Sequence, residues 1–131
     1  MGREIVLNGA ESAPPAGHYS HSCSAGGFVW ISGQLPVTPY GEIIAGAPFE
    51  EQVRQVLRNL DACLAGAGIT RRELVSVRVF VTNIGLWPEF NKIYAEWIED
   101  YRPSRAVAGV SELHYGAAVE VEAVALGPAG V

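Results

Sequence analysis

The 131-residue sequence has little of the chemistry that metal centres, disulfide scaffolds and nucleic-acid surfaces require. It contains two cysteines, Cys23 and Cys63, whose separation matches no common zinc or disulfide pattern, so we expect two reduced thiols. Nine residues are basic and fourteen are acidic, which gives a net charge of −5. A protein that binds the nucleic-acid backbone needs clustered basic side chains, and the only adjacent pair is Arg71 and Arg72. Nucleic-acid binding is therefore disfavoured.

Long apolar runs are also missing, so the sequence predicts no membrane-spanning segment. The first residues reach the acidic Glu4 without the apolar stretch of a signal peptide, which favours a cytoplasmic protein. Apolar content is nevertheless high, because 49% of the residues are hydrophobic and only 18% are charged. A chain of this length and composition can bury a core without metal or disulfide support. We expect one globular domain over residues 1–131.

Hydrophobic periodicity predicts two helices and several strands. Apolar residues at three- and four-residue spacing predict a helix over 49–67, and a second amphipathic stretch begins after Pro88 and ends before Pro103. Alternating or β-branched runs predict a hairpin over 20–25 and 28–32, and further strands over 74–82, 105–112 and 118–126. This order predicts an α+β or α/β sandwich in which both helices cover one face of the sheet.

Strand alternation also sorts side chains onto two faces of the sheet. The apolar face, which we expect under the helices, carries Val75, Val77, Val79, Val81, Ala106, Ala108, Val110, Val119, Val121, Ala123 and Ala125. The opposite face then carries Arg78, Arg105, Glu120 and Glu122, with Glu122 expected to pair with Arg78. This charged face is either a solvated surface with cross-strand ion pairs or the contact surface for another copy of the chain, and alternation alone favours the first.

Three segments of the sequence resemble the YjgF/Rid family of reactive-intermediate deaminases. They are Ile31-Ser32-Gly33-Gln34-Leu35-Pro36-Val37, Asn91-Lys92-Ile93-Tyr94, and Pro103-Ser104-Arg105 followed by Leu113 and by Val119-Glu120-Val121-Glu122-Ala123. The segment Gly17-His18-Tyr19-Ser20-His21 resembles the family's Gly-Pro-Tyr-Ser-Gln with two substitutions. The resemblance covers residues 16–125. It implies a chorismate-mutase-like α+β fold, with a mixed sheet and two helices on one face, assembled as a homotrimer whose inter-subunit clefts are lined by the charged face.

The resemblance further implies an activity that needs no cofactor, the hydrolysis of enamines and imines such as 2-aminoacrylate to a 2-keto acid and ammonia. Arg105 would hold the substrate carboxylate through a bidentate pair, and Glu120 would deprotonate water and then protonate the departing amine. We expect the nearby Arg105 to favour the ionised form of Glu120. The residues that would orient the substrate are Tyr19, Ser32, the amides around Gly33, and Asn91 from the neighbouring subunit.

The chain departs from the family pattern at several positions. Val107 stands where the family usually has a cysteine that helps to position the substrate, which reshapes the pocket but leaves hydrolysis possible. His18 and His21 replace a proline and a glutamine, and His114 with the following tyrosine replaces a proline-containing turn. Because no third ligand accompanies the two histidines, hydrogen bonding is a better interpretation than metal binding. A bulkier or more polar substrate than 2-aminoacrylate fits these changes.

Three functions remain open from the sequence. We favour an imine and enamine hydrolase that takes small imino acids and releases keto acids. The second is a regulatory trimer that binds small carboxylates through Arg105 without turning them over. The third is RNA cleavage, an activity attributed to some members of the resembled family, which the acidic charge and the absence of a histidine pair at Arg105 disfavour.

Overall fold

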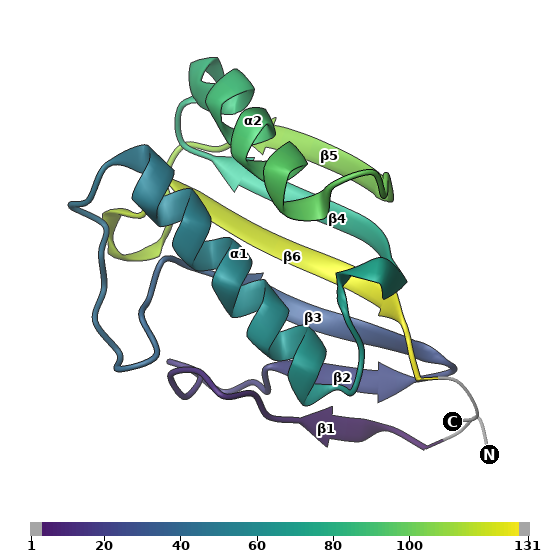
Figure 1. Cartoon of the computed structure of the whole chain (residues 1–131). Coiled ribbons are helices and arrows are strands. Elements are labelled where there is room, and N and C mark those ends of the chain that lie inside the picture. Colours follow the sequence, from purple (N-terminus) through teal and green to yellow (C-terminus); the bar gives the residue numbers. More distant parts are fainter. Residues whose placement is uncertain (1–3, 129–131) are drawn as a thin grey trace.

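The computed structural model describes residues 4–128, which form one six-stranded sheet and two α-helices (Figure 1). The elements are β1 (Val6–Asn8), β2 (Ser22–Ala25), β3 (Phe28–Gln34), α1 (Phe49–Gly66), β4 (Leu74–Val81), α2 (Trp87–Ile98), β5 (Ser104–Gly109) and β6 (Val119–Leu126). The strand order is β1-β2-β3-β6-β4-β5, antiparallel throughout except for the parallel pair β4 and β5. The expected α+β architecture with a mixed sheet is confirmed. Neither helix of the described residues has the length and apolarity that crossing a bilayer requires.

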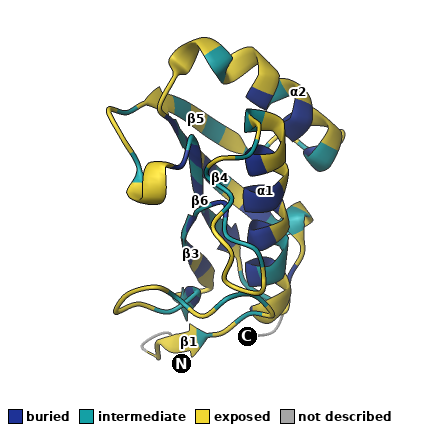
Figure 2. Ribbon diagram, turned by 90° about the vertical axis from the view of Figure 1, so that its left-hand side faces the viewer, coloured by how far each residue is buried: buried dark blue, intermediate teal, exposed yellow. Residues whose placement is uncertain are grey.

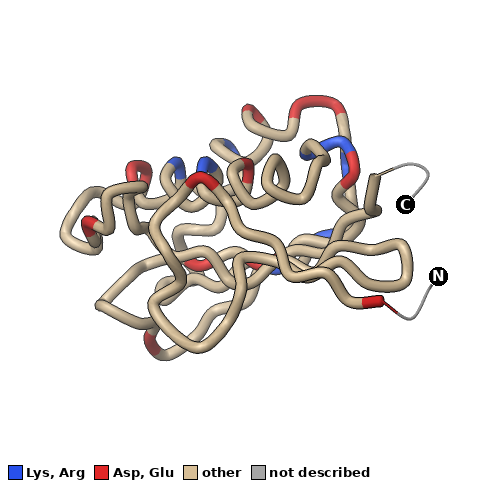
Figure 3. Tube along the Cα trace, turned by 90° about the horizontal axis from the view of Figure 1, so that it is seen from below, with Lys and Arg blue, Asp and Glu red and all other residues tan. Residues whose placement is uncertain are grey.

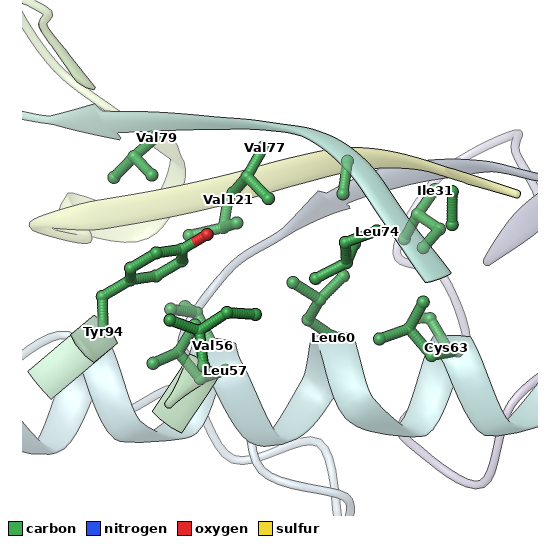
Figure 4. Packing of buried hydrophobic residues seen from close by; sticks show 14 of the residues in the cluster. Ile31, Val56, Leu57, Leu60, Cys63, Leu74, Val77, Val79, Tyr94 and Val121 are labelled. Atoms are coloured by element: carbon green, nitrogen blue, oxygen red, sulfur yellow. The ribbon is translucent and has the colours of Figure 1, made fainter. Parts of the chain in front are cut away.

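Both helices lie on one face of the sheet, α1 against β3 and β6 and α2 over β4 and β5 (Figures 1 and 2). The apolar side of α1 is buried as predicted, including Leu60 and Cys63, and these residues pack against Leu74 and other sheet residues (Figure 4). A helix in water derives most of its stability from burying such a face rather than from intrinsic propensity. The packing therefore fixes α1 against the centre of the sheet.

Asp61 of α1 connects the two helices. Its carboxylate accepts one hydrogen bond from the Trp97 indole of α2 at 2.8 Å and another from the Arg71 guanidinium at 3.0 Å. The same guanidinium lies over the Trp97 ring, 4.7 Å from its centroid. These contacts hold α2 in place relative to α1, which matters because α2 carries the residues that contact Arg105.

The beginning of β4 differs from its predicted alternation. The pairing with β6 shifts between Leu74 and Ser76, so β4 has a bulge there. As a consequence Leu74 is fully buried and Val75 is exposed, whereas the sequence placed Val75 under the helices. After the bulge the alternation is as expected, with Val77, Val79 and Val81 all buried.

Strand β5 has the opposite phase from the predicted one. It pairs in parallel with β4 so that Arg105 lies beside the buried Val77. Directly paired residues share a face of the sheet, so Arg105 lies on the helix side, and the exposed Ala106 and Ala108 face away from the helices. The prediction of Arg105 on the charged face, with the alanines beneath the helices, is therefore wrong, and Val110 lies beyond the end of the strand.

The sheet face that no helix covers carries charged and aromatic side chains. Arg78 and Glu122 pair there at 3.5 Å, as predicted, and Glu120 lies on the same face two residues from Glu122. Trp30 and Phe28 of β3 are 54% and 40% exposed beside them. This open face of the sheet thus combines an ion pair with large apolar groups.

Candidate active site

Glu120 of β6 lies in a pocket of about 400 Å³ on the open face of the sheet. The loop before β2, the end of β3 and the turn before β6 form the other walls, which are lined by Ala16, Gly17, Tyr19, Ser32, Gly33, Leu35, His114 and Tyr115. The structure thus brings together Tyr19, Ser32, Gly33 and Glu120 from three separate segments of the sequence. We call this pocket the Glu120 half-site.

Gly33 allows the Glu120 side chain to lie directly against the backbone of β3. The pairing of β3 with β6 shifts between Ile31 and Gln34, which brings Gly33 next to the Glu120 carboxyl group. A Cβ atom at position 33 would lie 3.0 Å from the carboxyl carbon of Glu120 and closer still to its Oε2 atom. A residue with a side chain here would displace the carboxylate, so glycine at this position allows Glu120 to lie where it does.

The Ser32 hydroxyl positions the loop that carries Tyr19. It donates a hydrogen bond to the Ser20 carbonyl at 2.7 Å, and the Ser32 amide donates to the His21 carbonyl at 3.1 Å. Both bonds attach the segment around Tyr19 to the end of β3. The hydroxyl proton is thereby engaged, which leaves the lone pairs of Oγ for a substrate.

Burial raises the pKa of Glu120 above the ordinary value for glutamate, with nearby His114 acting to lower it and Glu122 to raise it. Arg105, which the sequence analysis expected to stabilise the ionised form, makes no contribution within the chain because it lies on the other side of the sheet. That expectation is wrong for a single chain. A carboxylate with a raised pKa is a stronger base than a solvated one, which suits proton abstraction from water.

Arg105 forms a second cluster with two residues of α2. Its guanidinium donates a hydrogen bond to the Asn91 side-chain oxygen at 2.8 Å and lies over the Tyr94 ring, 4.9 Å from the ring centroid. Asn91 and Tyr94 are three residues apart and so share one face of the helix. These residues border a cavity of about 420 Å³, and we call them the Arg105 half-site. Tyr94 was not predicted as a site residue, although its three-residue spacing from Asn91 indicates a second contact on the same face of the helix.

Arg105 and Glu120 lie apart within one chain. Glu120 pairs with Phe80 of β4, which pairs in turn with Ala108 of β5, three residues beyond Arg105. An odd separation along a strand reverses the face, and Arg105 contacts α2 whereas Glu120 faces away from the helices. Asn91, expected from a neighbouring subunit, therefore belongs with Arg105 and stands apart from Glu120.

The remaining residues singled out from the sequence lie around these half-sites. Val107 packs partly buried against the core and lines neither of the two pockets. His21 hydrogen-bonds through Nε2 to the Ala13 carbonyl at 2.9 Å, and His18 is exposed. Among residues 4–128 no group of three or more histidine, cysteine or acidic side chains is arranged to hold a metal ion.

Known proteins resemble the chain over nearly its whole length. The family model described as Endoribonuclease L-PSP matches residues 10–127. A RutC family protein from Aquifex aeolicus is 40% identical over 115 residues, which cover 86% of this chain and 90% of the relative. A crystal structure of a conserved Rid family protein of unknown function from Yersinia pestis superposes with a TM-score of 0.89 at 36% identity, over 94% of this chain and 99% of that one. The chain belongs to the YjgF/Rid family.

Membership of the Rid family confirms the resemblance noted in the sequence. A further Rid-like fold is that of Escherichia coli TdcF, solved with bound serine, which has a TM-score of 0.86 and 29% identity over 94% of this chain and 99% of that one. These matches extend across both half-sites. The family model therefore spans every residue that we assign to the two half-sites.

Proposed function

We propose that the protein hydrolyses reactive enamines and imines of small carboxylic acids at a site that a second copy of the chain completes. The observation that carries the proposal is the separation of Arg105 from Glu120 on opposite faces of one chain. The Arg105 guanidinium can hold the carboxylate of a substrate, and the Glu120 carboxylate can act on water. Within one chain, however, each half-site lacks the group that the other provides. A neighbouring subunit that presents its Arg105 to the Glu120 half-site supplies what is missing.

The two half-sites favour a ring of identical subunits. A contact in which one surface of a subunit meets a different surface of the next is heterologous, and such contacts close into a ring when the rotation is right. The resemblance to the Rid family supports a ring of three subunits, a homotrimer. The open face of the sheet supports this assembly, because exposed Trp30 and Phe28 are large apolar groups that contact with another copy would bury.

The proposed reaction uses both half-sites. The Arg105 fork binds the substrate carboxylate through two parallel hydrogen bonds and leaves the C=N carbon beside Glu120. Water gives a proton to Glu120 as its oxygen bonds to that carbon, and the protonated Glu120 then gives the proton to nitrogen. The adduct is a carbinolamine. Glu120 then takes the proton of its hydroxyl group and gives it to the nitrogen as the C=O bond forms and the C–N bond breaks, so the products are a 2-keto acid and ammonia. The serine bound to Escherichia coli TdcF is an amino acid with a carboxylate, which supports a ligand of this class.

RNA cleavage is the less favoured activity despite the name of the matching family model. Basic and acidic positions are interspersed along the described chain (Figure 3), and the net charge is −5. RNA binding relies on positive surface that neutralises phosphate groups. A labelled RNA incubated with the protein in magnesium-free buffer is expected to remain intact.

The decisive assay generates imino acids in situ with an amino-acid oxidase and measures their decay with and without the protein. Glu120→Gln is expected to lose about a hundred- to ten-thousandfold of the acceleration, because glutamine cannot take a proton from water. Glu122→Gln is the matched control, since Glu122 lies on the same face and pairs with Arg78 instead; it should keep most of the acceleration, although it removes a charge that raises the pKa of Glu120. If the parent binds pyruvate but accelerates no imine, the protein is a carboxylate-binding module and the hydrolase proposal fails.

Subunit mixing tests the composite site directly. Arg105→Ala and Glu120→Gln proteins are each expected to be inactive when pure. Unfolding and refolding them together should restore activity, because roughly a quarter of the contacts in randomly mixed trimers pair an intact Arg105 with an intact Glu120. A mixture as inactive as its two components would contradict a site shared between subunits.

A further inference from the structure

A second cavity, of about 200 Å³, adjoins the Glu120 half-site. It lies between the loop at residues 12–16, the end of β3 and the segment that leads to α1. Ala16, Tyr19, Gly33, Leu35 and Tyr115 line both this cavity and the Glu120 pocket. The two cavities are therefore neighbours that share these residues, and a substituent of a molecule held beside Glu120 would enter the second one between the exposed side chains of Tyr19 and Tyr115.

The walls of this second cavity are mainly apolar. Pro14, Pro15, Val37 and Ile43 line it and do not line the Glu120 pocket. Hydrophobic side chains and prolines offer a ligand no hydrogen-bonding group, so they favour an apolar substituent.

The buried polar side chains on the wall are already engaged. Asn59 donates to the Leu35 and Val37 carbonyls at 3.0 and 2.9 Å, and its oxygen accepts from Gln55 at 2.9 Å. Gln34 donates to the Ser32 carbonyl at 2.8 Å. A polar substituent that entered this cavity would therefore find the Asn59 amide group and the Gln34 amide nitrogen already hydrogen-bonded within the chain.

The volume of the cavity also limits the substituent. An apolar cavity of about 150 Å³ inside a protein accommodates benzene. A space of about 200 Å³ therefore suits a phenyl ring or a branched chain of four carbons. The single methylene group of 2-aminoacrylate would leave most of it empty.

We propose that this cavity binds the side chain of the substrate, so that the enzyme selects 2-imino acids with branched aliphatic or aromatic side chains. This inference rests on the proposed hydrolysis and specifies its substrate class. The imine carbon lies beside Glu120, the carboxylate points to the Arg105 of the neighbouring subunit, and the side chain passes between Tyr19 and Tyr115. Each methylene in a fitted apolar pocket changes kcat/KM by about 10- to 200-fold.

The test compares imines that an amino-acid oxidase makes from alanine, leucine and phenylalanine. The leucine- and phenylalanine-derived imines are expected to have kcat/KM values about tenfold or more above that of the alanine-derived imine, after correction for their decay in buffer. Binding of 4-methyl-2-oxopentanoate should exceed binding of pyruvate by a similar factor. Equal kcat/KM values for all three imines, or a preference for the alanine-derived one, would overturn the inference.

Variants that fill the cavity test whether the preference for larger imines arises there. Ile43→Trp and Ala13→Phe fill the cavity from two different segments, and neither residue lines the Glu120 pocket. Each is expected to lower kcat/KM for the larger imines about tenfold or more and to change the alanine-derived imine less than about twofold. Ile5→Trp is the control for adding an exposed tryptophan, because Ile5 is 66% exposed and Ile43 is 46% exposed.

The outcomes separate this inference from the proposed function. If the parent protein accelerates none of the three imines, the hydrolase proposal has failed. If it accelerates the alanine-derived imine and the filling variants impair all three imines equally, hydrolysis stands and the side-chain cavity is refuted. A filling variant that alters the mass of the assembly in light scattering also refutes it, because the cavity would then serve subunit contact.

Discussion

Substitution of Gly33 by alanine should separate catalysis from stability. Gly33 is not among the glycines with positive φ, so its backbone accepts alanine, and such a change usually adds about 0.4–1 kcal/mol to the free energy of unfolding. The new Cβ would lie 3.0 Å from the carboxyl carbon of Glu120 and forces that flexible side chain to move. A displacement of about 1 Å at a reacting group costs about a hundredfold in rate. Gly33→Ala is therefore expected to keep its stability within about 1 kcal/mol of the parent and lose about a hundredfold of imine hydrolysis.

Two further variants make the Gly33→Ala experiment specific. Gly46→Ala is the matched control, because its Cβ would meet no atom within 4 Å, and we expect parental activity from it. Combining Gly33→Ala with Glu120→Gln should cost little more activity than Glu120→Gln alone, since both changes act on one group. Urea unfolding and the oxidase-coupled assay measure the two quantities. Activity of Gly33→Ala within a few-fold of the parent would refute the reasoning that this glycine positions the carboxylate.

Three other predictions test the two half-sites and the contact between α1 and α2. Arg105→Lys keeps the charge but loses the planar fork, so calorimetry should show pyruvate binding weakened about tenfold or more, and equal affinity would remove Arg105 from the site. Because His114 acts to lower the pKa of Glu120, His114→Gln should move the low-pH limb of kcat/KM to higher pH than in the parent, whereas an unmoved limb would contradict their coupling. Asp61→Ala leaves two donors without their acceptor and should lower the free energy of unfolding by about 1–3 kcal/mol, whereas Asp100→Ala, which removes an exposed ion pair, should cost much less; equal losses would contradict the role given to Asp61.

The helices and most of the sheet could be predicted from the sequence because their apolar patterns are strong. The apolar stripe on α1 and the alternating valines of β4 each indicate a single face of the element that can be buried in the core. Strand β5 carried no such signal, since Ala106 and Ala108 are small enough to lie on either face. Its phase depends on the parallel register with β4, which sets Arg105 beside Val77 and is a property of the assembled sheet.

The candidate site was predictable in its members but not in its arrangement. Glu120, Tyr19, Ser32 and Gly33 were identified through the resemblance to the Rid family and do meet in one pocket. Their separation from Arg105 follows from strand register and could not be found from residue spacing alone. The adjoining apolar cavity depends on three loops whose conformations have no periodic signal.

Tyr94 belongs to the hydrophobic core and to the Arg105 half-site at the same time. Only 5% of its surface is exposed, its ring stacks with Phe90, and the Arg105 guanidinium lies over the same ring. A substitution that changes the packing of the buried face of α2 will therefore move the Tyr94 ring over which the Arg105 guanidinium lies. During evolution, core substitutions that would be neutral in another protein will alter ligand affinity here. The buried face of α2 is therefore constrained by ligand binding as well as by the stability of the fold.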